Sequence, residues 1–379
     1  MILYLAHIGS GDGSSIGVIN KILGQVKAIK KFTSIKCIIY YSKTRPVISE
    51  SSLKDDILIV PNISNYKIYR RFKMVKSYNL FSRLYSDANI LIRFQTIDPF
   101  FLIYLFFNRK RKLFFERQSK ELYESILTAS VSNFGFSLFD YLMYPIASKF
   151  IDGEIAVTKE IAEYLKRRNR TGKIIVVPNG IESRYINTFP KFDVSTIKLC
   201  FAGNITKWSG LNYLIYELER IQFKLNGANL ILYIIGEGIC LRDIKMIAEN
   251  INQKANIKFL GALNGEEKEK VLLESNIGIS SLNSKRRHLK EGSNLKNREY
   301  CLFGLPFIKV DSDPDFDNKN GTCDFFRNIN DRGDIINKLS ELVEVLYTKN
   351  EIRYEMNDYA NKYLSWDTKI KAYINMIEK

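Results

Sequence analysis

Cysteine and proline are scarce in this sequence of 379 residues, and each scarcity excludes a class of protein. The five cysteines are odd in number and scattered, so they form neither a disulfide framework nor the CxxC spacing of a zinc site. We therefore expect the protein in a reducing cytoplasm. The eight prolines, beside a 46% share of hydrophobic residues, give no sign of a disordered region, and the chain is predicted to fold throughout.

Long apolar runs are also absent. The longest, residues 99–107 (PFFLIYLFF), has about half of the ~20 residues that a membrane-spanning helix needs. The chain begins with a short apolar strand and then glycines, without the basic and apolar regions of a secretory signal. We expect neither a spanning helix nor export.

Positive charge is unevenly distributed. Residues 1–190 contain 29 Lys and Arg against 15 Asp and Glu, a net charge of +14, whereas residues 191–379 carry only +2. The surplus can simply keep the surface solvated, or it can serve an anionic membrane, a phosphate-bearing substrate or nucleic acid. Cations lie beside aromatic residues at 69–73 and 106–115, a mixture that favours a bilayer interface.

Strand and helix patterns alternate along the chain, and the alternation starts again after residue 192. Such alternation favours parallel sheets covered by helices. We therefore predict an α/β protein with two Rossmann-like domains, residues 1–190 and 191–363, that face each other across a cleft. The expected strands are 1–8, 35–41, 57–60, 90–94, 113–116, 153–157 and 174–177 in the first domain, and 197–201, 230–235 and 257–260 in the second.

The strongest local motif is residues 291–299 (EGSNLKNRE), in which two glutamates flank a Gly/Ser/Asn loop that enters an apolar helix. Such a loop can present backbone N–H groups and the positive end of a helix dipole to a phosphate. The carboxylates can accept hydrogen bonds from sugar hydroxyls. The alternative is a helix whose N-terminus simply favours acidic residues.

These residues resemble the E-x7-E and G-x-P signature of the retaining glycosyltransferases of family 4, which have the GT-B fold. Glu291, Glu299, Gly304 and Pro306 stand in the matching places, and residues 295–300 look like the LKxREY form of the bacterial polysaccharide-assembly branch. Further elements match in order: residues 177–182 resemble PNGID, 201–211 the GxLxxWKG turn, 236–238 the GxG turn and 259–261 the FxG strand end.

The resemblance implies a hexosyltransferase (EC 2.4). It would move a sugar from a nucleotide-diphosphate sugar to a saccharide or polyprenyl-linked acceptor, with retention of anomeric configuration. The setting would be the synthesis of a bacterial surface polysaccharide such as a capsule or O-antigen. The last helix, residues 364–379, would cross back onto the acceptor-binding first domain.

The resemblance also implies roles for particular residues. Glu299 would hold the ribose hydroxyls, Glu291 would contact the donor sugar, and Lys296 would offset charge on the departing diphosphate. The other donor-binding candidates are Gly292, Ser293, Asn294, Leu295, Gly203, Asn204, Lys207, Gly236 and Gly261. Neither a metal nor a cofactor is expected, and the aspartates of residues 311–315 are interpreted as a solvated turn.

Two features depart from the family. Asn204 and Ser209 stand where many members have Arg and Lys to clamp the diphosphate, and nearby Lys207 could substitute. The histidine that many members place near the reacting sugar could be His7, although a satisfied polar residue at a strand end is the alternative. Glu116 is a candidate acceptor contact. The glycine-rich first loop, with Gly11, Gly13, Ser14 and Ser15, is an acceptor or phosphate loop or else a flexible turn.

The charge and the resemblance together predict a cytoplasmic protein, peripheral to the inner face of the plasma membrane. The expected membrane contact is residues 106–115, whose alternative is a surface helix packed by its phenylalanines. Two other classes of protein compete with the transferase. A dinucleotide-dependent two-domain enzyme requires GxGxxG, which is missing, and a basic nucleic-acid-binding protein would require a recognition motif that we do not find. We expect no nucleic-acid partner.

Overall fold

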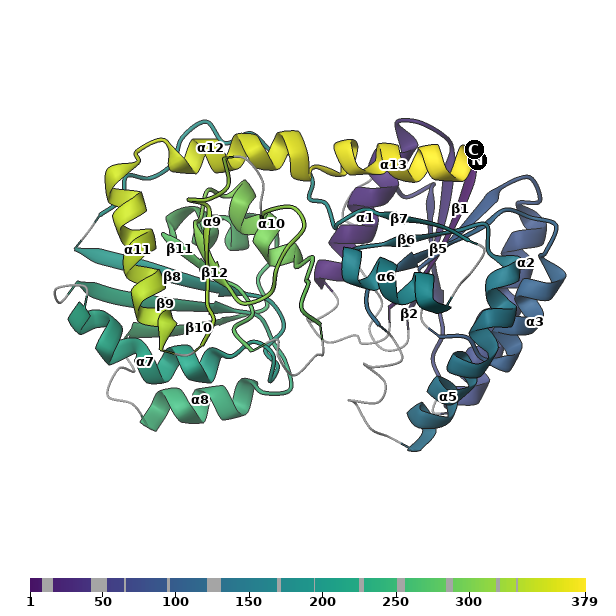
Figure 1. The fold of residues 1–379 in the computed structure, drawn as a ribbon, viewed down its shortest axis with the longest axis horizontal. Helices are drawn as coiled ribbons and strands as arrows, with labels where there is room; N and C mark the ends of the chain where they lie inside the picture. Colours follow the sequence, from purple (N-terminus) through teal and green to yellow (C-terminus); the bar gives the residue numbers. More distant parts are fainter. Residues whose placement is uncertain are drawn as a thin grey trace. The chain divides into compact units, whose positions relative to one another are not determined.

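The computed structural model describes residues 1–8, 16–41, 53–64, 66–93, 96–120, 131–168, 172–193, 195–224, 228–250, 256–283, 289–317, 321–331 and 333–379. The chain divides into two compact units, which we call the first unit (Met1–Pro178 with Lys369–Lys379) and the second unit (Asn179–Thr368). Each is a parallel sheet covered by helices, so the predicted α/β class with two Rossmann-like domains is confirmed (Figure 1).

The first unit contains a seven-stranded sheet in the order β3-β2-β1-β4-β5-β6-β7. Its central strands are largely buried because helices cover the sheet, and β1 exposes only part of His7, whereas the edge strands β3 and β7 are partly exposed. Asp98 caps α3 by accepting a hydrogen bond from the Phe101 backbone at 2.9 Å. The strands are β1 (Ile2–Ile8), β2 (Ile35–Tyr41), β3 (Ile57–Pro61), β4 (Asn89–Arg93), β5 (Leu113–Arg117), β6 (Gly153–Ala156) and β7 (Lys173–Val176).

The helices of the first unit are α1 (Ile16–Lys30), α2 (Lys67–Leu84), α3 (Pro99–Phe107), α5 (Val131–Ala147), a short 3-10 turn (Ser148–Phe150) and α6 (Lys159–Arg168). The C-terminal helix α13 (Trp366–Glu378) joins them from Lys369 onward. Asn89 donates a hydrogen bond to the carbonyl of Ile377 at 3.1 Å, and Met376 fills the space beside Gly153. These contacts hold the end of the chain against β4 and β6.

The second unit contains a six-stranded sheet in the order β10-β9-β8-β11-β12-β13. Its strands are β8 (Thr196–Ala202), β9 (Asn229–Ile235), β10 (Ile257–Gly261), β11 (Ile277–Ile279), β12 (Phe307–Lys309) and β13 (Phe326–Asn328). The strand order reverses between β8 and β11. Open α/β sheets bind ligands at the carboxyl ends of the strands beside such a switch point.

The helices of the second unit are α7 (Leu211–Lys224), α8 (Leu241–Asn250), α9 (Gly265–Glu274), α10 (Leu295–Leu302), α11 (Asp334–Thr348) and α12 (Ile352–Tyr359). No helix in the described parts of the chain is long and apolar enough to cross a bilayer.

The second unit begins at Asn179, earlier in the chain than residue 190. Two asparagines near the C-terminal end of the second unit bind the segment that follows Asn179. Asn357 and Asn361 both donate side-chain hydrogen bonds to the carbonyl of Arg184, at 2.9 and 3.0 Å. Asn361 also accepts from the Arg184 backbone N–H at 2.7 Å. Residues that connect the two predicted domains are therefore part of the second one.

Candidate functional site

Three glycines form close turns at the carboxyl ends of β8, β9 and β10. Gly203 and Gly236 have φ angles of 149° and 134°, and a Cβ on Gly236 would lie 2.0 Å from the carbonyl oxygen of Gly203. The Gly236 N–H donates to the carbonyl of Gly261 at 2.7 Å. Because no side chain fits between these backbones, the glycines allow the ends of the three strands to pack closely together. The structure thus brings together three glycines predicted to bind the donor.

Lys296 places a positive charge beside this edge. It lies in the first turn of α10, and its Nζ is 3.9 Å from the ring centroid of Phe201, at the end of β8. A Cβ on Gly203 would meet Lys296 Cε and Nζ at 3.3 Å. The cation adds to the positive end of the α10 dipole, an arrangement that suits an anionic group.

Glu299 lies one turn further along α10, where both its carboxylate oxygens accept hydrogen bonds from Lys268 Nζ, at 2.6 and 2.7 Å. The two side chains are 21% and 23% exposed, so the ion pair remains accessible. Lys268 belongs to α9, and none of the motifs in the sequence points to it. Only its position in the sequence could have indicated Lys268, which lies near the start of the helix that follows the FxG strand end.

Glu291 lies in the loop before α10, and this loop is fastened to the segment that follows β12. Glu291 pairs with Ser312 in an isolated parallel bridge. The Gly292 N–H donates to the Ser312 carbonyl at 2.8 Å, and the Ser312 N–H donates to the Lys290 carbonyl at 3.0 Å. The backbone around Glu291 is thereby held in one conformation.

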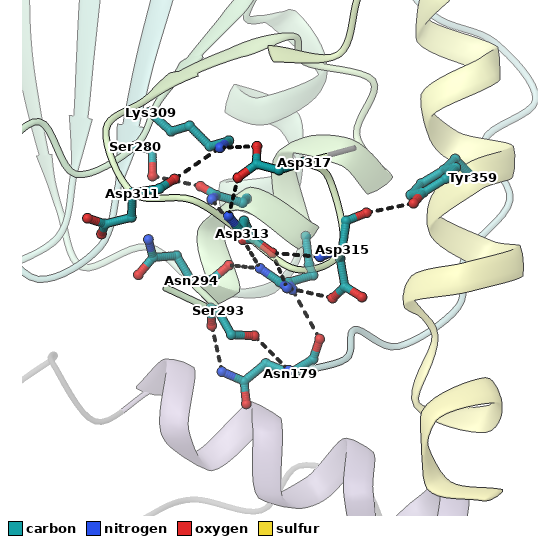
Figure 2. Close-up of polar contacts among 12 residues, drawn as sticks. Asn179, Ser280, Ser293, Asn294, Lys309, Asp311, Asp313, Asp315, Asp317 and Tyr359 are labelled. Carbon is teal, nitrogen blue, oxygen red and sulfur yellow. Dashed lines mark hydrogen bonds and ion pairs between the residues drawn. The ribbon is translucent and has the colours of Figure 1, made fainter. Parts of the chain in front are cut away.

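Arg298 organises the loop through buried hydrogen bonds, and Figure 2 labels its partners Asn179, Asn294, Asp313 and Asp315. Its guanidinium is fully buried and donates to Asp313 at 2.5 and 2.7 Å and to Asp315 at 2.5 Å. It also donates to the carbonyls of Asn179 at 3.0 Å and Asn294 at 3.1 Å. Burial lowers the pKa of Arg298, but the two carboxylates outweigh burial, and the pKa lies above its usual value.

The prediction of a solvated turn at residues 311–315 is therefore wrong. Asp313 is 0% exposed, and Asp311 and Asp315 are each 8% exposed. The turn residues are evident in the sequence but their partner is not, because Arg298 precedes Asp313 by 15 positions. Asp313 and Asp315 neutralise Arg298 and fix the loop that follows β12.

Asn179 joins the start of the second unit to the same loop (Figure 2). Its backbone N–H donates to the Ser293 hydroxyl at 2.8 Å, and its side-chain Nδ2 donates to the Ser293 carbonyl at 2.6 Å. Ser293 and Asn294 are thus held by Asn179 and Arg298. This contact gives a structural reason for the asparagine in the PNG element.

The remaining donor candidates lie on turns around the site. Asn204 and Lys207 are exposed on the turn after β8, where the Lys207 carbonyl accepts a hydrogen bond from Asn283 Nδ2 at 3.0 Å. Ser209 is buried and donates its hydroxyl hydrogen bond to the carbonyl of Thr206 at 2.6 Å. Gly292 precedes α10 and Leu295 opens it.

Glu116 does not have the surroundings of an acceptor contact, and that prediction is wrong. It is 0% exposed and is bound by Lys21 at 2.9 Å, Tyr4 at 2.8 Å, Gln25 at 2.7 Å and Tyr373 at 2.9 Å. Burial would raise the pKa of Glu116, but its partners, chiefly Lys21, lower the pKa to about 2. Glu116 is an internal anchor that joins β1, β5 and α1 to the C-terminal helix.

His7 lies at the end of β1 and is partly buried. Burial, together with the positive charges of Arg71 and Arg70, lowers the pKa of His7 to about 3. The glycine-rich loop candidates Gly11, Gly13, Ser14 and Ser15 lie outside the described residues, as does His288.

His7 should therefore remain neutral across the physiological range. Its NMR resonances in a His288→Gln protein, which has no other histidine, should show no titration between pH 8 and pH 5. The unfolded chain binds a proton near pH 6.5 and the folded chain does not, so stability should fall as pH drops below about 6.5. A titration midpoint near 6.5 in the folded protein would contradict this environment.

Comparison with known proteins agrees with the geometry. Residues 187–360, which hold α10 and the glycine turns, match the family model described as "Glycosyl transferases group 1". An uncharacterized glycosyltransferase of Methanocaldococcus jannaschii is 27% identical over 233 residues, which cover 59% of this chain and 56% of that protein. The chain thus matches little more than half the length of that relative.

Solved structures of similar fold cover the whole chain. The lipopolysaccharide outer core galactosyltransferase WaaB is 15% identical with a TM-score of 0.61, over 100% of this chain and 99% of that one. The pneumococcal O-GlcNAc transferase GtfA, solved with UDP and GlcNAc, is 12% identical with a TM-score of 0.67, over 100% and 99%. S. aureus TarM, solved with UDP, is 12% identical with a TM-score of 0.66, over 100% of both. The fold is that of the GT-B glycosyltransferases.

Proposed function

We propose that this chain is a retaining glycosyltransferase that moves a hexosyl group from a nucleotide-diphosphate sugar to a saccharide or polyprenyl-linked acceptor. The observation that carries the proposal is the edge of the second sheet, where the close turns at Gly203 and Gly236 lie beside the Lys296 cation and the N-terminus of α10. That edge lies within residues 187–360, the matched glycosyltransferase domain. The relatives named above that were solved with UDP support a nucleotide donor.

In this proposal the donor diphosphate lies against the N-terminus of α10, and the ribose lies near Glu299. The bond between the anomeric carbon and the diphosphate oxygen breaks, and the electron pair leaves with the nucleotide diphosphate. An acceptor hydroxyl forms the new bond on the same face and gives its proton to the departing diphosphate oxygen. Lys296 and the α10 amides stabilise the charge on the leaving group, so the reaction as proposed needs no metal ion or cofactor.

Glu291 is proposed to contact the donor sugar, since its loop is fixed to Ser312 on one side and leads directly into α10 on the other. The Gly292–Leu295 backbone would line the same subsite. Asn204 and Lys207, exposed on the turn after β8, are proposed to face the diphosphate.

We further propose a role in bacterial surface polysaccharide synthesis, at the cytoplasmic face of the plasma membrane. The name of the WaaB relative, a lipopolysaccharide outer core galactosyltransferase, supports this setting. The net charge of +14 in residues 1–190 supports association with an anionic leaflet, where each surface cation contributes about 1 kcal/mol. Co-sedimentation with vesicles tests the association.

Glu299→Gln should weaken nucleotide-sugar binding about tenfold, because a charge-assisted hydrogen bond worth about 1.5–3 kcal/mol becomes a neutral one worth about 0.5–1.5 kcal/mol. Isothermal titration calorimetry with UDP-sugars and GDP-sugars measures the change. Glu267→Gln makes the same chemical change at an exposed glutamate of α9, one position before Lys268, and should bind the donor normally. Equal affinities in the two variants would remove Glu299 from the donor site.

A further inference from the structure

An apolar groove lies on the first unit between α3, α5 and the short turn after α5. Its volume is about 520 Å³. The six side chains that line it are all apolar: Leu102, Ile103, Phe106, Phe107, Ile146 and Phe150. The Phe106 and Phe150 rings meet edge to face with centroids 6.2 Å apart, which joins the two sides of the groove.

The groove opens to solvent through large apolar side chains. Phe107 is 73% exposed, Ile103 is 52% exposed and Ile146 is 46% exposed. Leu138 and Leu142 extend the apolar surface along the same helix as Ile146, at the i, i+4 and i+8 spacing of one helical face. Single exposed apolar residues scattered over a surface are ordinary, whereas a contiguous apolar surface of this kind marks an interaction site.

The predicted membrane segment, residues 106–115, therefore divides into two parts. Phe114 and Phe115 are 2% and 0% exposed and belong to the core strand β5. Arg111 is also structural, since its guanidinium donates to the carbonyls of Ser82, Tyr85 and Ala88. Only the first part of the segment faces solvent, and it does so as one wall of the groove.

The rim of the groove is basic. Arg109 and Lys110 are exposed just after α3, and Lys149 is exposed beside Phe150. The Arg109 guanidinium carbon lies 4.5 Å from the Phe106 ring centroid, so a cation and an apolar wall share one surface. In residues 96–120 and 131–152, the acidic side chains other than Asp152 are buried: Asp98, Glu116 and Asp140.

We propose that this groove is a membrane-docking surface that takes up hydrocarbon chains of an anionic bilayer. Phe107 and Ile103 insert among the lipid acyl chains, while Arg109, Lys110 and Lys149 contact the lipid phosphates. Apolar insertion and a basic rim are the two signals that stable peripheral binding requires. This proposal rests on the membrane association proposed above, and it adds which surface binds the membrane and which side chains insert.

The charge of the rim favours a bilayer over a second copy of the chain. In a two-fold symmetric dimer the same surface patch meets itself, so the basic rims would face each other with only Asp152 as an exposed counter-charge in residues 96–120 and 131–152. Anionic headgroups supply the missing charge.

The test compares Phe107→Ser/Ile146→Ser with the control Tyr216→Ser/Tyr347→Ser, which removes two exposed apolar side chains, 60% and 70% exposed, from the second unit. Co-sedimentation uses vesicles of phosphatidylglycerol with phosphatidylcholine, and vesicles of phosphatidylcholine alone. Wild type and control should bind the anionic vesicles. The groove variant should bind them with an affinity at least about tenfold lower. Added salt should weaken the binding of all three, because it screens the basic rim.

A second readout locates the insertion. Phe107→Trp adds an indole at the mouth of the groove to the native Trp208 and Trp366, so its emission is read as the difference from wild type. On vesicles this added emission should shift to the blue and be quenched by lipids brominated on their acyl chains. Absent quenching, or equal sedimentation of the groove variant and wild type, overturns the proposal. A wild type that is dimeric in solution beside a monomeric groove variant also overturns it, in favour of self-association.

Donor binding in vesicle-free solution separates this proposal from the proposed function. The groove variant should bind nucleotide sugars as wild type does, because the groove and the donor edge belong to different units. A wild type that binds nucleotide sugars but no vesicles defeats only the groove. A wild type that binds vesicles through the groove but no nucleotide sugar defeats only the proposed transferase.

Discussion

Replacing Arg298 with methionine should destabilise the second unit by about 3–5 kcal/mol, because the change removes one partner of a buried ion cluster. Asp313 would remain buried with its charge uncompensated, and the carbonyls of Asn179 and Asn294 would each lose a donor. Urea denaturation followed by circular dichroism measures the loss, which should be confined to the transition of the second unit.

Arg220→Met is the matched control. Arg220 lies on α7 and is 69% exposed, and its pair with Glu217 is an i,i+3 surface contact. Such a pair contributes little, so the control should change stability by less than about 0.5 kcal/mol. If Arg298→Met and Arg220→Met unfold at the same urea concentration, the cluster does not stabilise the unit as we describe.

Glu291→Ala should lower the rate of sugar transfer by about 100-fold or more while changing nucleotide affinity only slightly. The reason is its proposed partner, the reacting sugar, whose charge changes in the transition state. Turnover and nucleoside-diphosphate affinity are measured in parallel on Glu291→Ala and on Glu267→Ala, in which an exposed glutamate of α9 is removed. An equal fall in turnover and in affinity would assign Glu291 to nucleotide binding and not to the sugar.

The local parts of the site could be predicted from the sequence. Gly203, Gly236 and Gly261 each follow a short apolar strand, and a glycine in that position predicts a turn at a sheet edge. The loop and helix at residues 291–302 are likewise predictable, because a Gly/Ser/Asn stretch followed by an apolar pattern typically opens a helix.

Contacts between distant segments could not be predicted in this way. Lys268 reaches Glu299 across 31 positions, and Tyr373 reaches Glu116 across 257. Nothing in the sequence around Glu116 indicates that the C-terminal helix covers it. Composition also could not separate the two parts of residues 106–115, since aromatic residues of a buried strand and of an exposed helix end look alike.

The central claim is that the carboxyl edge of the second sheet binds a nucleotide-diphosphate sugar. Saturation-transfer difference NMR of the whole protein against a panel of UDP-, GDP-, ADP-, CMP- and dTDP-sugars tests it most directly. We predict strong transfer to the ribose and sugar protons of at least one member, and titration of that signal should give a Kd about tenfold weaker in Glu299→Gln and unchanged in Glu267→Gln. A folded protein that gives no transfer to any member of the panel, or a Kd that Glu299→Gln leaves unchanged, would contradict the claim.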